Sequence, residues 1–188
     1  VFTYYRWWQW LNASDSTQRR LAAALDLQAR YDADPTSIKA EALAARAVPE
    51  WIAAEIDPVP AGWLELLQRD AALWIRVQSE FAAAVPRALG NCTAADLSTF
   101  LSPPPAPATA YRFGGFNDLF RTDEFHKGLF EIQDLASQLV GHACAPQPGE
   151  TWWDTCAGEG GKTLHLADQM KNKGLIWASD RSARRLAA

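Results

Sequence analysis

A glycine-rich turn between two short apolar runs constrains the fold of this 188-residue chain most strongly. The first run ends at Asp154, and the second ends at Asp180, nineteen residues after the last glycine of the turn. That turn holds three glycines: Gly158, Gly160 and Gly161. Glycines let a backbone approach a ligand closely, and the free N–H groups at a helix start favour an electron-rich group. The order predicts a strand, a helix and a second strand that bind a nucleotide, with the final acid against ribose hydroxyls.

Both common phosphate-binding patterns fail in this turn. The phosphate-loop pattern G-x-x-x-x-G-K-[ST] fits the end of the turn but requires a glycine where Cys156 stands. The dinucleotide pattern G-x-G-x-x-G fits Gly158 and Gly160 but fails at Thr163. S-Adenosylmethionine remains, because a methyltransferase loop has no phosphate to hold and needs only close backbone approach and a ribose acid.

Two segments resemble a known family of enzymes. Residues 154–163, Asp-Thr-Cys-Ala-Gly-Glu-Gly-Gly-Lys-Thr, resemble the D-x-C-A-A-P-G-G-K-T loop of the Sun/Fmu/NOP-type RNA (cytosine-5) methyltransferases. Upstream, residues 128–140 resemble that family's G-x-x-x-x-Q-D-x-A-S-Q-x-V segment, at the family's distance from the loop. Gly158 and Glu159 stand where the family usually has Ala-Pro, which predicts a less rigid turn and a carboxylate near the cofactor.

The resemblance implies an enzyme that transfers a methyl group from S-adenosyl-L-methionine to cytosine in RNA, with rRNA the commoner substrate and tRNA next. It implies that the cofactor is bound by Cys156, Ala157, Gly158, Glu159, Gly160, Gly161, Lys162 and Asp180. The family's two cysteines, one of them the nucleophile, occur in Pro-Cys-Ser and Thr-Cys-Ser. The three cysteines of this chain lie in neither pattern, so no catalytic residue is predicted here.

The predicted fold is α/β, in three parts. Residues 1–58 form a helical N-terminal region, and residues 59–127 form a small α+β accessory domain resembling an RNA-binding one. Residues 128–188 begin a Rossmann-like, S-adenosylmethionine-dependent methyltransferase domain. A complete domain of that class has more strands than the two core parallel strands that fit before the last residue. We therefore expect the chain to be a fragment that does not methylate RNA by itself.

Local patterns predict further elements and their burial. Residues 15–33 are amphipathic, with Ser14 or Asp15 as the predicted N-cap, and residues 72–77 alternate as a strand does. The proline-rich residues 102–109 predict a stiff extended connector. The nine tryptophans predict a buried aromatic core rather than base stacking, because their neighbours are mostly apolar.

Composition argues against several classes of protein. The formal net charge of −4 provides no global basic field for a polyanion, and the one short basic cluster is Arg181, Arg184 and Arg185. Three cysteines without a C-x-x-C pair argue against a disulfide framework or a zinc site. No apolar run reaches the length of a membrane span. We therefore expect a cytoplasmic protein that binds neither a metal nor a membrane.

Two rival interpretations stay open at this point. A non-catalytic RNA-binding or assembly protein with a degenerate cofactor-binding fold would suit the departures from the loop pattern and the missing nucleophile. An NTPase would suit the Gly-Lys-Thr sequence that ends the turn, although Cys156 disfavours it. Titration with S-adenosylmethionine and with ATP separates a methyltransferase from an NTPase.

Overall fold

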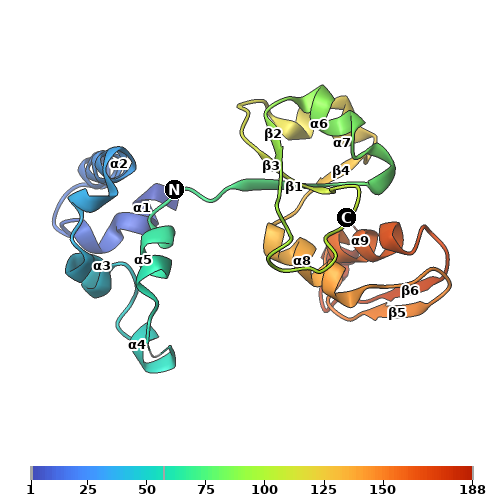
Figure 1. Cartoon of the computed structure of the whole chain (residues 1–188). Helices are drawn as coiled ribbons and strands as arrows, with labels where there is room; N and C mark the ends of the chain where they lie inside the picture. Colours follow the sequence, from blue (N-terminus) through green and yellow to red (C-terminus); the bar gives the residue numbers. More distant parts are fainter. Residues whose placement is uncertain (1, 57, 188) are drawn as a thin grey trace. The chain divides into compact units, whose positions relative to one another are not determined.

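The computed structural model describes residues 2–56 and 58–187, and the chain divides into two compact units (Figure 1). The first unit extends to Ala71, and the second begins at Ala72. The three-part division expected from the sequence, with boundaries after residues 58 and 127, stays a prediction. Within the described residues, no helix combines the length and the apolar character needed to cross a membrane.

The first unit is helical. Its α-helices are α1 (Phe2–Trp7), α2 (Thr17–Ala33), α3 (Ala40–Arg46), α4 (Ile52–Glu55) and α5 (Ala61–Leu67). Helix α2 begins after Ser16, whose hydroxyl accepts a hydrogen bond from the backbone N–H of Arg19 at 3.3 Å. The predicted N-cap, Ser14 or Asp15, is therefore wrong by one or two residues, because the residue that satisfies a free N–H of the first turn is Ser16.

Trp7, Ala24 and Tyr31 form the core of the first unit. The side chain of Gln28 lies beside them and joins three segments. Its Oε1 accepts a hydrogen bond from Trp7 Nε1 at 2.9 Å, and its Nε2 donates to the backbone carbonyl of Gln68 at 3.0 Å. A buried amide with partners on both sides thus holds α1, α2 and the end of α5 together.

The second unit begins with a four-stranded antiparallel sheet in the order β2-β3-β1-β4. The strands are β1 (Leu73–Val77), β2 (Cys92–Ala94), β3 (Ala110–Phe113) and β4 (Phe130–Ile132). Helices α6 (Ala84–Leu89) and α7 (Asp123–His126) belong to the same region. Its core consists of Ile75, Val77, Val85, Leu89, Phe113, Leu119 and Phe130. The strand predicted at residues 72–77 is confirmed as β1, and residues 102–109 contain no helix or strand.

The predicted strand–helix–strand unit follows this sheet. It consists of β5 (Thr151–Asp154), α9 (Gly161–Gln169) and β6 (Leu175–Ala178), preceded by α8 (Leu135–Cys144) and followed by α10 (Ala183–Leu186). Strands β5 and β6 pair in parallel, with Thr151 opposite Leu175 and Asp154 opposite Ala178. The carboxylate of Asp134 caps α8 by accepting the N–H of Ala136 at 3.0 Å. These elements confirm the α/β class.

Most tryptophans lie outside the core, contrary to the expectation from the sequence. Trp7 is fully buried, whereas Trp8, Trp51, Trp153 and Trp177 are more than half exposed. Trp153 and Trp177 are partners across β5 and β6 and therefore share one face of this two-stranded sheet. Apolar neighbours in the sequence do not ensure burial, because a strand has two faces and in the described structure α9 packs on the other one.

Helices α8 and α9 approach each other closely at Gly141. A Cβ atom on Gly141 would lie closer than 3.0 Å to Nδ1, Cε1 and Cγ of His165, whose side chain is 2% exposed. Gly141→Ala adds a steric cost of about 1–3 kcal/mol, at the upper end because a buried ring cannot turn away. This cost outweighs the gain in helix propensity of about 1 kcal/mol.

We expect Gly141→Ala to lower the free energy of unfolding, measured by urea denaturation and far-UV circular dichroism. Gly62→Ala in α5 is the matched control, because no atom lies within 4 Å of the added Cβ. The control is expected to be neutral or stabilising. If Gly141→Ala behaves in the same way, the close packing of α8 on α9 is contradicted.

Candidate functional site

Glycines shape the turn between β5 and α9. Gly158 and Gly160 have φ values of +58° and +90°, in the left-handed region that glycine adopts readily. The N–H of Gly160 donates to the carbonyl of Ala157 at 2.9 Å, and Gly160 immediately precedes α9. No side chain of the described residues caps this helix, so its first N–H groups are available to an electron-rich ligand.

Asp154 organises the start of the turn from the end of β5. Its Oδ1 accepts the N–H of Cys156 at 3.2 Å, and its Oδ2 accepts the hydroxyl of Thr163 at 2.7 Å. The end of the strand is thereby tied to the first turn of α9. The turn also bonds to the next strand end, because the N–H of Ala157 donates to the carbonyl of Ser179 at 3.0 Å.

Asp180 lies against the turn from beyond the end of β6. Its Oδ1 accepts the N–H of Ser182 at 2.7 Å, and its Oδ2 accepts the N–H of Gly158 at 2.9 Å. These hydrogen bonds, first that of Ser182 and then that of Gly158, together with the nearby Arg185, hold the pKa of the carboxyl below its ordinary value. The group is therefore an ionised acceptor near neutral pH, as binding of ribose hydroxyls requires.

Arg185 also lies at the turn, although its sequence pattern indicated only a basic cluster. Its Nη1 is 3.8 Å from Oδ2 of Asp180, and a Cβ on Gly158 would lie closer than 3.0 Å to its Nη2. The spacing in the sequence could have indicated this contact, because Arg185 follows Asp180 by only five residues. The short helix α10 brings the Arg185 side chain back to the end of β6.

The structure brings together most of the residues predicted to bind the cofactor. Ala157 and the three glycines form the turn, and Asp180 contacts it from beyond the end of β6. Cys156, Glu159 and Lys162 are exposed. No metal-binding group of three or more His, Cys, Asp or Glu side chains occurs among the described residues.

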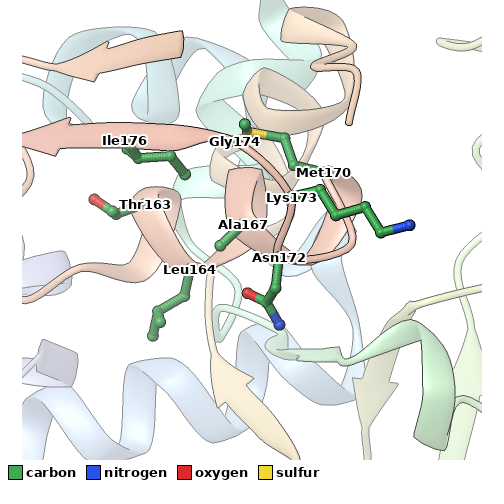
Figure 2. Close-up of a pocket in the computed structure, with 8 residues that line it drawn as sticks. All are labelled: Thr163, Leu164, Ala167, Met170, Asn172, Lys173, Gly174 and Ile176. Atoms are coloured by element: carbon green, nitrogen blue, oxygen red, sulfur yellow. The ribbon is translucent and has the colours of Figure 1, made fainter. Parts of the chain in front are cut away.

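A pocket of about 250 Å³ is lined by α9, the segment that follows it and β6 (Figure 2). Its lining residues are Thr163, Leu164, Ala167, Met170, Asn172, Lys173, Gly174 and Ile176. None of these is among the predicted cofactor-binding residues, and the Thr163 hydroxyl already donates to Asp154. The pocket is thus separate from the turn, and we do not assign the cofactor to it.

The part of the chain that contains the turn is similar to known methyltransferases. The family model described as 16S rRNA methyltransferase RsmB/F matches residues 142–188, which include the turn and Asp180. The crystal structure of a methyltransferase homolog protein from Pyrococcus horikoshii has a TM-score of 0.54 and 26% sequence identity. That similarity covers 66% of this chain and 40% of the other.

Individual relatives match shorter stretches of the chain. The "Probable ribosomal RNA small subunit methyltransferase B" of Synechocystis sp. is 45% identical over 62 residues, which are 33% of this chain and 14% of that protein. The human tRNA (cytosine(72)-C(5))-methyltransferase is 48% identical over 50 residues, which are 27% of this chain and 11% of that protein. The chain thus matches a small share of the length of these relatives. The relationship expected from the two motifs is confirmed: the C-terminal part of the chain is related to the Sun/Fmu/NOP-type RNA (cytosine-5) methyltransferases.

Proposed function

We propose that this chain binds S-adenosyl-L-methionine and serves the methylation of carbon 5 of a cytosine in RNA. The observation that carries the proposal is the joint geometry of the turn and Asp180. Two glycines with positive φ allow close approach, the start of α9 is uncapped, and an ionised carboxylate lies at the turn. We further propose rRNA as the substrate, since the matching family model and the Synechocystis relative are both named for rRNA methylation. The cytoplasm is the compartment that we propose, as expected from the sequence.

The residues at the turn would contact different parts of the cofactor. The backbone around Gly158 and Gly160 would lie against the cofactor, and Asp180 would accept hydrogen bonds from its ribose hydroxyls. Lys162, exposed at the start of α9, would contact the cofactor carboxylate. When bound, the cofactor supplies a methyl group on a sulfonium centre.

Methyl transfer to carbon 5 also needs a thiolate that adds to the cytosine ring and makes that carbon nucleophilic. The family resemblance expects that thiol in Pro-Cys-Ser or Thr-Cys-Ser, and this sequence contains neither. We therefore propose that these 188 residues supply cofactor binding and not the nucleophile. A non-catalytic RNA-binding protein would also lack the nucleophile, but the named relatives are methyltransferases and favour the first function.

Isothermal titration of the 188-residue chain tests this proposal directly. We expect S-adenosylhomocysteine and S-adenosylmethionine to bind with one site per chain, because the turn provides one ribose acid. ATP with Mg²⁺ is expected to give no binding heat, because Cys156 stands where a phosphate loop needs glycine. Binding of ATP without binding of either adenosyl compound would replace the methyltransferase with an NTPase.

A further inference from the structure

Arg76 is buried in the second unit and has no place in the site described above. It lies on β1 of the antiparallel sheet, and its side chain is 2% exposed. A buried guanidinium group costs free energy unless charged and hydrogen-bonding partners compensate for the lost water. One partner of Arg76 lies between β4 and α8, and the other lies on α9, the helix that begins at the cofactor turn.

The first partner is Gln133, which follows β4. Arg76 Nε donates to Gln133 Oε1 at 2.9 Å. The backbone of Gln133 is held on both sides: its N–H donates to the carbonyl of Trp74 at 3.1 Å, and its carbonyl accepts from Gln138 Nε2 at 2.8 Å. With the backbone fixed and Oε1 occupied, the amide nitrogen is directed away from Arg76. It lies 3.6 Å from where a Cβ of Gly161, the first residue of α9, would be.

The second partner is Asp168, near the other end of α9. Arg76 Nη1 lies 3.9 Å from Asp168 Oδ2. The same oxygen accepts the N–H of Ser79 at 3.3 Å and the hydroxyl of Ser79 at 3.1 Å. Ser79 follows β1 by two residues, so both contacts tie the end of α9 to the same strand.

Two histidines between α8 and α9 complete the buried cluster. The rings of His142 and His165 are 4.7 Å apart. Burial, and after it the charge of Arg76, lowers the pKa of His165 to about 3 and also lowers the pKa of His142. Both rings are therefore neutral at physiological pH, and Asp168 has Arg76 as its buried cationic partner.

We propose that Arg76 is a positioning residue for the cofactor turn: through Gln133 and Asp168 it fixes both ends of α9 against the antiparallel sheet. This inference rests on the proposed function, because the turn is taken as the cofactor site, and it adds a role for the sheet in setting the geometry of that site. Lysine cannot replace arginine fully, because one ammonium group does not reproduce the separate Nε and Nη contacts.

The test compares Arg76→Met with two controls in the 188-residue chain. Val77→Ala removes buried volume from the next residue of β1, and Arg112→Met removes an exposed positive charge from β3. The first readout is the amide chemical shifts of Gly158, Gly160 and Gly161 in ligand-free protein. The second is the Kd for S-adenosylhomocysteine at a temperature at which every variant is folded.

We expect Arg76→Met to shift the three glycine amides and to raise the Kd by about tenfold, within the range of couplings between distant sites. Arg76→Lys is expected to be intermediate. Val77→Ala should lower Tm while leaving the glycine amide shifts and the Kd unchanged. Arg112→Met should leave the glycine amide shifts and the Kd unchanged as well. Loss of the guanidinium charge should also raise the pKa of His142, measured by NMR titration.

Unchanged glycine amides in Arg76→Met, or equal shifts in Val77→Ala, would overturn the positioning role. If Arg76→Met does not fold, the amide shifts of the three glycines are measured in Arg76→Lys and in Asp168→Asn. Unchanged glycine amides in both of these variants would also overturn the positioning role. If the wild-type chain binds no adenosyl compound, the proposed function fails. The amide shifts of the ligand-free variants then still decide whether Arg76 positions the turn.

Discussion

Gly174→Ala is expected to destabilise the strand–helix–strand unit severely. Gly174 has a φ of +128°, a conformation that side chains rarely adopt. A Cβ there would lie closer than 3.0 Å to the carbonyl oxygen of Glu150 and to Cε of Met170. That carbonyl accepts the N–H of Leu175 at 3.0 Å in the pairing of β5 with β6, so the backbone cannot retreat without breaking the sheet.

Backbone strain and overpacking together are expected to cost about 2–6 kcal/mol, a large share of the about 5–15 kcal/mol that stabilise a typical domain. Urea denaturation followed by far-UV circular dichroism measures the loss. Gly149→Ala is the matched control, because Gly149 also has a positive φ of +95° but no atom lies within 4 Å of its added Cβ. The control carries backbone strain alone. Equal losses in the two variants would show that no steric clash exists at Gly174.

Asp180→Ala is expected to remove measurable binding of S-adenosylhomocysteine. Two ribose hydroxyls donating to one carboxylate make hydrogen bonds worth about 1.5–3 kcal/mol each, so their loss raises the Kd by about 100-fold or more. The substitution also frees the N–H groups of Gly158 and Ser182, which now bond to this carboxylate, and so loosens the turn.

Titration calorimetry of Asp180→Ala, Asp180→Asn and Asp134→Ala checks this expectation. Asp180→Asn keeps one acceptor oxygen and loses the charge, so it should bind with intermediate affinity. Asp134→Ala removes the acid that caps the N-terminus of α8 and should cost stability without changing the Kd. Wild-type affinity in Asp180→Ala would mean that this carboxylate does not hold the ribose.

The strand–helix–strand unit could be predicted because its signals are local. Apolar runs, turn glycines and a strand-end acid follow one another within about one βαβ length, so spacing alone places them together. Strand β2 (Cys92–Ala94) has only three residues and no alternating pattern long enough to identify it.

The contacts of Arg76 could not be predicted from spacing, for a different physical reason. Gln133 lies 57 residues from Arg76, and Asp168 lies on a helix of another part of the unit. Neither pair has a local pattern, because each arises from how sheet and helices pack. Ser16 was missed as the N-cap of α2 because Ser14 and Asp15 are equally suitable residues, and only the backbone geometry selects among the three.

The uneven exposure of the tryptophans makes intrinsic fluorescence a selective reporter. Indole emission moves to longer wavelength when a buried ring meets water, and the fully buried ring, Trp7, lies in the first unit. Trp153 and Trp177 of the second unit are already hydrated in the native state. A fluorescence melting curve will therefore respond most strongly to loss of the core around Trp7 and weakly to changes around Trp153 and Trp177. A backbone signal recorded beside it detects damage to the cofactor turn that these exposed rings do not report.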